Sequence, residues 1–208
     1  RSIWQPSMTA DRCAGSMPNS AASGISAFIT GWLGRPAKAA WTSWRHQASL
    51  VAATPASSFL KARGIAFALL EYRHDPRAEG YGMEAAEKLG LDAASVFKTL
   101  VVWDEGSAHA LALVPVASRL SLGAAAKALG WKRATLARPA DAERLTGYVL
   151  GGISPFGTRR PLPVVADRSI SLLAAVHVSG GRRGVEIRVG PGDLMRALDA
   201  RLADIAAV

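Results

Sequence analysis

A lysine inside an otherwise apolar segment is the residue of this sequence best suited to chemistry. Lys98 lies in the run Val96–Trp103 (VFKTLVVW), and strand alternation places it on one face with Val96, Leu100 and Val102. Both faces are apolar, which predicts a strand buried on both sides. A lysine there must extend its amine to water, bind an anion or have a lowered pKa. The run therefore predicts a functional lysine, or alternatively an edge lysine with a solvated ammonium.

Two glycine-rich loops could bring backbone N–H groups close to a ligand. Residues 151–157 (GGISPFG) contain adjacent glycines but lack the Gly-Lys-Ser/Thr ending of a phosphate-binding P-loop. Residues 179–184 (SGGRRG) join two expected strands, and Arg182 and Arg183 could contact phosphates. Each loop could equally be a tight connection, with the two arginines solvated at a hairpin tip.

Other catalytic patterns are missing from the sequence. The single cysteine, Cys13, can form neither an internal disulfide nor a cysteine-rich zinc site. The four histidines are scattered without metal-binding spacing, and no Gly-x-Ser-x-Gly motif is present. We interpret His74 beside Asp75 as a turn. We therefore expect no metal, no cofactor and no set of nucleophile, base and orienting group.

The elements that must position these residues alternate irregularly between helix and strand. Thr54-Pro55 predicts a helix start and Gly64 its end. Hairpins outnumber helical crossovers, which favours an α+β fold with an antiparallel or mixed sheet. The expected strands are 65–72, 96–103, 108–114, 163–166, 172–178 and 185–189; the other expected helices are 83–89, 121–129, 139–145 and a last one from Pro191 with Leu194, Leu198 and Leu202 on one face.

The composition is that of one domain with an appendage. The chain has 208 residues and a net charge of +9, which suits a phosphate-bearing partner such as a nucleic acid, although a GC-rich genome would also favour arginine. No apolar run reaches the roughly 18 residues that a membrane-spanning helix needs, so we expect a cytoplasmic protein. Residues 1–53 hold four of the six tryptophans, five Arg/Lys and one Asp, without a helical or strand period. We interpret them as a disordered extension or as sequence upstream of the true start.

Six segments, taken in order, resemble the YbaK/EbsC family, whose relatives include the editing domain inserted in bacterial prolyl-tRNA synthetases. They cover residues 54–208, which we expect to form one editing domain. The segments are 54–56 (TPA), 72–76 (YRHDP), 81–86 (YGMEAA), 96–100 (VFKTL), 147–155 (GYVLGGISP) and 178–184 (VSGGRRG).

The resemblance implies a mixed, largely antiparallel, barrel-like sheet surrounded by helices. It makes Lys98 the family's essential lysine, which would orient the terminal adenosine of a tRNA or its phosphate. Gly151-x-x-x-Pro155 would be the loop at the aminoacyl carbonyl. Where the family often has a short polar or acidic residue, this chain has the longer Glu186. The implied catalytic residues are Lys98, Gly151 and Ser179, and the implied substrate-binding residues are Tyr72, Tyr81, Gly152, Ile153, Ser154, Pro155, Gly180 and Glu186.

The branch that the chain resembles most is the free-standing Cys-tRNA(Pro) deacylases. In these, the thiol of the substrate is thought to attack its own ester carbonyl, so the protein needs to supply positioning and oxyanion stabilisation. The implied partners are mischarged tRNA, with prolyl-tRNA synthetase as an optional one. The alternatives are an editor for alanine or serine, and a tRNA- or synthetase-binding module without catalysis.

Overall fold

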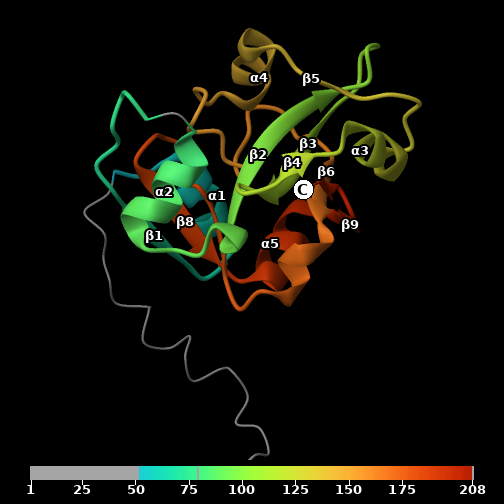
Figure 1. The fold of residues 1–208 in the computed structure, drawn as a ribbon. Coiled ribbons are helices and arrows are strands. Elements are labelled where there is room, and N and C mark those ends of the chain that lie inside the picture. The colour runs from blue at the N-terminus through green and yellow to red at the C-terminus, as the bar shows by residue number, and fades with distance from the viewer. Residues whose placement is uncertain (1–51, 79, 208) are drawn as a thin grey trace, which may run out of the picture. The chain divides into compact units, whose positions relative to one another are not determined.

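The computed structural model describes residues 52–78 and 80–207, and these form an α+β domain with helices packed around one large sheet (Figure 1). The expected disorder of residues 1–53 therefore falls almost entirely outside the described residues. None of the helices in this described part is long and apolar enough to cross a membrane. The α+β class that the sequence predicts is confirmed.

The elements follow one another in a mixed order. The helices are α1 (Pro55–Ala62), α2 (Tyr81–Leu89), α3 (Leu122–Leu129), α4 (Pro139–Thr146) and α5 (Pro191–Leu198), with short 3-10 helices η2 (Ala93–Ser95) and η3 (Arg168–Leu172). The strands are β1 (Phe67–Glu71), β2 (Val96–Trp103), β3 (His109–Pro115), β4 (Arg119–Leu120), β5 (Thr135–Leu136), β6 (Val164–Asp167), β7 (Val176–Ser179), β8 (Val185–Val189), β9 (Arg201–Ala203) and β10 (Ala206–Ala207).

The main sheet is mixed and mostly antiparallel. Its strand order is β1-β8-β7-β2-β3-β6-β9, and β5 pairs with β2 beside this path. The β2–β7, β3–β6 and β6–β9 pairs are parallel and the others are antiparallel. Within the described residues no pairing joins the end strands β1 and β9, so the sheet is not closed into a barrel. The resemblance implies a barrel-like sheet, but the observed sheet is open, because each end strand is paired on one edge only.

Strand β2 has one complete edge and one interrupted edge. It pairs with β3 from Phe97 to Trp103. On the other edge, β7 reaches only Val96 and Phe97, and β5 reaches only Val102 and Trp103. The backbone groups of Thr99 lie between these two short pairings, where no described strand faces them.

Both faces of β2 are buried, as the sequence predicts. Phe97 and Val101 belong to a large core cluster with Phe156 and Ile187. Val102 belongs to a second cluster on the other face, together with small residues of β3. The strand therefore lies between two hydrophobic layers, and a polar side chain on it can be accommodated only where a cavity interrupts the packing.

The predicted cap of α1 is confirmed, and it has a long-range function. The Thr54 hydroxyl accepts a hydrogen bond from the Ser57 backbone N–H at 3.1 Å and donates to the Gly180 carbonyl at 2.6 Å. Thr54 is buried, with 6% of its surface exposed. This hydrogen bond joins the start of α1 to the loop after β7.

Four expected boundaries are wrong. Strand β1 begins at Phe67 rather than Ile65. Helix α2 begins at Tyr81 rather than Met83, which places Tyr81 on the helix. The expected strand 172–178 begins only at Val176, because Leu172 ends η3 and is 86% exposed. Helix α5 ends at Leu198, because Asp199 adopts a left-handed conformation with φ 47°, and Leu202 instead pairs with Ala166 in the sheet.

Replacing Thr54 by Val should lower the free energy of unfolding by about 2 kcal/mol. The change leaves a buried amide and a buried carbonyl without their hydrogen-bond partner at nearly constant volume. Urea unfolding followed by circular dichroism measures the loss. Ser107→Ala, on an exposed turn, is the control and should change stability by less than about 0.5 kcal/mol. Equal stabilities of the two variants would contradict the role of Thr54.

Candidate active site

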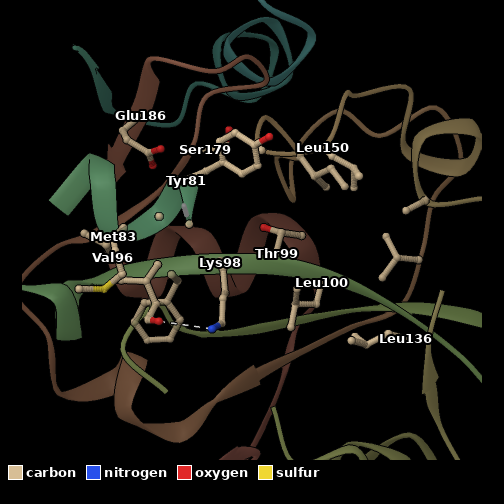
Figure 2. A pocket seen from close by; sticks show the side chains of 18 of the residues that line it. Tyr81, Met83, Val96, Lys98, Thr99, Leu100, Leu136, Leu150, Ser179 and Glu186 are labelled. Carbon is tan, nitrogen blue, oxygen red and sulfur yellow. Dashed lines mark hydrogen bonds between the residues drawn. The ribbon is translucent and has the colours of Figure 1, made fainter. Parts of the chain in front are cut away.

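A cavity of about 420 Å³ lies along the interrupted edge of β2 (Figure 2). Its walls come from β2, the start of α2, the loop after α4, and the ends of β7 and β8. At Thr99, the edge of β2 opposite β3 has no neighbouring strand among the described residues. Residues from both faces of β2 reach the cavity there. The lining residues are Gly80, Tyr81, Gly82, Met83, Val96, Phe97, Lys98, Thr99, Leu100, Val101, Val116, Leu136, Ala137, Ala142, Leu150, Gly151, Ile153, Ser179 and Glu186.

Six of the eleven predicted site residues line this cavity. They are Tyr81, Lys98, Gly151, Ile153, Ser179 and Glu186. Segments that are far apart in the sequence are thus brought to one place. Tyr72, Gly152, Ser154, Pro155 and Gly180 are not among the lining residues.

Lys98 is half-buried in the cavity wall. Its ammonium donates a hydrogen bond to the Val116 carbonyl at 3.3 Å, and Figure 2 shows it directed away from Tyr81 and Ser179. No acidic side chain in the described part of the chain forms an ion pair with it. Burial lowers the pKa of Lys98, and the positive charge of Arg119 lowers it further. The amine is therefore available to an anionic or carbonyl ligand.

Glu186 is the one acidic residue among the described residues of the lining. Its side chain is almost fully enclosed, with 6% of the residue exposed, and its Oε2 atom has no hydrogen-bond partner among the described residues. Burial raises the pKa of Glu186 to about 8. A carboxyl group in this state is uncommon in a protein unless a ligand or a neighbour compensates it.

The glycine loop and α2 are packed against each other to form one wall. Gly151 has φ +82°, and a Cβ there would come within 2.6 Å of the Tyr81 ring, so only glycine fits. The Arg183 guanidinium lies 4.9 Å from the centre of the same ring and donates to the Leu150 carbonyl at 2.9 Å. These contacts fix Tyr81 at the rim of the cavity.

The predicted residues outside the lining support the walls. Gly152 lies against the backbone of Arg182, where a Cβ would come within 2.9 Å. Ser154 is fully buried and its hydroxyl accepts a hydrogen bond from Phe156, while Pro155 is also buried. Gly180 accepts the hydrogen bond of Thr54. The loop 151–155 thus presents Gly151 and Ile153 to the cavity and uses its other residues for packing.

Tyr72 directly follows the last residue of β1. Its backbone N–H donates to the Gly184 carbonyl at 3.0 Å. Burial raises the pKa of the Tyr72 hydroxyl to about 12, and the negative charges of Glu186 and Glu84 add to this effect. The charge of Glu186 therefore reaches Tyr72, although Tyr72 does not line the cavity.

Thr99 is a functional candidate that sequence reasoning missed. It lines the cavity and is 9% exposed, and its hydroxyl has no hydrogen-bond partner among the described residues. Figure 2 shows it on the opposite side of β2 from Lys98. A hydroxyl beside a lysine in an apolar run is a weak signal, and the missing strand neighbour is not visible from local sequence.

The fold and the cavity define a class of protein. The cavity offers a cation, an acid, the Thr99 hydroxyl and the open backbone edge of β2 inside mostly apolar walls, which is typical of a site that binds and orients a small polar group. In the described part of the chain, no group of three or more His, Cys, Asp or Glu residues could hold a metal.

The model of the aminoacyl-tRNA editing domain family matches residues 78–197, which include most of the cavity. This chain therefore belongs to that family. It is 32% identical over 120 residues to a protein of Enterococcus faecalis named "Putative Cys-tRNA(Pro)/Cys-tRNA(Cys) deacylase EbsC", covering 58% of this chain and 73% of the relative.

Two further similarities concern editing proteins. The chain is 41% identical over 59 residues to the multifunctional Ser/Thr-tRNA deacylase ProXp-y of Escherichia coli K12, covering 28% of this chain and 35% of the relative. A crystal structure of "a putative trans-editing enzyme for prolyl tRNA synthetase" superposes with a TM-score of 0.67 and 28% identity, over 74% of this chain and 96% of the other.

The pKa of Glu186 predicts a stability that depends on pH. Because the folded-state pKa is about 8 and the ordinary value is 4.5, the folded state holds a proton that the unfolded state releases. The free energy of unfolding should fall by on the order of 3–5 kcal/mol as the pH rises from about 4.5 to about 8. Chemical denaturation at a series of pH values measures this fall. Glu186→Gln should flatten it, and parallel profiles of the two proteins would contradict the assignment.

Proposed function

We propose that this protein is an editing hydrolase that deacylates mischarged aminoacyl-tRNA, and that Cys-tRNA(Pro) is its substrate. The single observation that carries the proposal is the cavity on the interrupted edge of β2, which collects Lys98, Gly151 and Ser179 in a chain of the editing-domain family. The name of the Enterococcus relative supports cysteine as the amino acid. A cytoplasmic location and an optional association with prolyl-tRNA synthetase belong to the same proposal.

The chemistry requires little from the protein. In the proposed reaction the cysteine sulfur of the substrate forms a bond to its own carbonyl carbon, the bond from that carbon to the ribose oxygen breaks, and the thiol proton passes to the ribose oxygen. The products are a cyclic thiolactone, which water then hydrolyses, and free tRNA. An ester is already activated, so orientation and stabilisation of the developing oxyanion account for the acceleration.

The cavity residues have separate roles in this proposal. Lys98 places its positive charge near the terminal adenosine or its phosphate. Gly151 and the open backbone edge at Thr99 offer N–H groups to the carbonyl oxygen. The apolar walls exclude water and admit a small side chain, and proline is spared because it has no thiol to cyclise.

A second candidate substrate is serine or threonine attached to tRNA. The similarity to the Ser/Thr-tRNA deacylase covers 59 residues, and a side-chain hydroxyl could take the place of the thiol. An alanyl ester, by contrast, would need a water molecule positioned by the enzyme. A binding module without catalysis would leave every ester intact.

Lys98→Ala should lower the rate of Cys-tRNA(Pro) deacylation at least 100-fold. The loss of one charge-assisted contact to the substrate in a half-buried site corresponds to about 3 kcal/mol. Release of labelled amino acid from a panel of tRNAs carrying Cys, Ser, Thr, Ala or Pro measures both the rate and the preference.

The matched control for this experiment is Lys127→Ala, an exposed lysine on α3. It should deacylate at the wild-type rate. Wild-type activity in Lys98→Ala would remove Lys98 from the mechanism. A wild-type protein that leaves the whole panel intact would show that it is not a deacylase for these substrates.

Replacement of the substrate thiol should separate cyclisation from direct hydrolysis. S-methylcysteinyl-tRNA(Pro) has nearly the same shape but cannot form the thiolactone, so its deacylation should fall to the uncatalysed rate. Thin-layer chromatography of the released amino acid, compared with a reaction without protein, follows the product. Rapid enzymatic release of S-methylcysteine would instead indicate attack by water.

A further inference from the structure

We propose that Glu186 binds the α-amino group of the aminoacyl ester and thereby restricts the site to substrates with a free amino group. This inference rests on the proposed function, because it identifies how that site recognises its substrate. It concerns a residue for which the chemistry above has no use, since neither the cyclisation nor the departure of the ribose involves a carboxyl group.

The position of Glu186 is that of a ligand-binding group. It lies on β8 between Leu70 of β1 and Ser179 of β7, and it is 6% exposed. Its Oε2 atom has no partner among the described residues, and Figure 2 shows the carboxyl group directed toward the space beside Tyr81 and Ser179. A buried polar atom aimed into a cavity is satisfied when a ligand supplies a donor.

The charges around Glu186 leave a place for a cation. On its own strand and the neighbouring elements, the titratable groups include Arg188 on β8, His177 on β7, Tyr72 after β1, Glu84 and Tyr81 on α2, and Lys98 on β2. Among the described residues, no ion pair or hydrogen bond joins a basic side chain to Glu186, and burial alone accounts for its raised pKa. Lys98 lines the same cavity but forms no ion pair with Glu186 in the described structure, and Glu84 is already bonded to His74 and Lys88. The carboxyl group therefore faces the cavity without a compensating positive charge.

An aminoacyl ester supplies this missing charge. Next to its carbonyl carbon it has one cationic group, the α-ammonium, and its other charges are phosphates. Lys98 and Glu186 thus match the two kinds of charge at the end of an aminoacylated RNA. Because burial raises the pKa of Glu186, its carboxyl group holds a proton. This proton passes to the nitrogen of a neutral ligand amine, or to solvent when the ligand is already an ammonium, so that a carboxylate and an ammonium are paired in the complex.

The site would therefore distinguish substrates with a free α-amino group from those whose α-nitrogen is part of an amide. A peptidyl or N-formyl ester carries a neutral amide at this position, which has one N–H donor where an ammonium has three and no positive charge. A site with a buried acid disfavours such a ligand because an ionised acid would have no compensating charge. The editing site would then act on aminoacyl-tRNA and spare peptidyl-tRNA.

The experiment compares Cys-tRNA(Pro) with N-acetylcysteinyl-tRNA(Pro) bearing a free thiol, two substrates that differ only at the α-nitrogen. The wild-type protein should prefer the free amine at least 30-fold in kcat/KM. Glu186→Gln should lower kcat/KM for Cys-tRNA(Pro) at least 30-fold and reduce the preference to less than 3-fold. Glu186→Asp keeps the carboxyl group and should retain a preference above 10-fold, and the exposed Glu87→Gln should behave as wild type.

A binding measurement tests the role of Glu186 without requiring any catalytic activity. The probe is 3′-deoxy-3′-(L-alanylamino)adenosine, whose amide bond is not hydrolysed, and its N-acetyl derivative is the reference. Calorimetry should show tighter binding of the free amine by wild type and similar binding of both probes by Glu186→Gln. This result would support the role of Glu186 even if no tRNA were deacylated, in which case only the proposed function would fail.

Two outcomes would overturn the inference. One is a wild-type protein that binds or hydrolyses the free and acetylated forms equally well. The other is a Glu186→Gln variant that loses activity on both forms by the same factor, because a purely structural role would produce that pattern.

Discussion

The interrupted edge of β2 is the constraint on which this structure depends. A strand buried between two hydrophobic layers normally has all its backbone groups paired on both edges. Here β3 completes one edge, while β7 and β5 cover only the two ends of the other. The intervening backbone at Thr99 needs a partner that the described sheet does not provide. The cavity lies at this place, so the interruption of the sheet and the candidate site are one feature.

The two glycine-rich loops pack closely enough to form the walls beside the interrupted edge. Gly151 packs on the Tyr81 ring, Gly152 packs on the Arg182 backbone, and Gly180 receives the Thr54 hydroxyl. A side chain at Gly151, Gly152 or Gly180 would clash with neighbouring atoms, so the loops can pack this closely only with glycine at these positions.

Local patterns in the sequence revealed part of this arrangement. The alternation around Lys98 predicted a strand buried on both faces, and Thr54-Pro55 predicted the start of α1, because both signals lie within a few residues. The gap beside Thr99 depends on where β5 and β7 end, and these strands lie far from β2 in the sequence. The position of Leu202 is hidden from local sequence for the same reason. Its spacing from Leu198 fits a helix, but the left-handed Asp199 ends the helix and Leu202 pairs with Ala166 in the sheet.

The cavity contains two ionisable side chains that are not paired with each other, and this lowers the free energy of unfolding. Burial disfavours the charged forms of both Lys98 and Glu186, as their shifted pKa values show, and the two do not neutralise each other as an ion pair. A packed pair of apolar side chains would stabilise the same space better. The unpaired groups make sense in a protein whose ligand brings a cation and an anion at separate positions. The aminoacyl end of a tRNA, the proposed substrate, has this distribution of charge, and its binding would stabilise the folded protein.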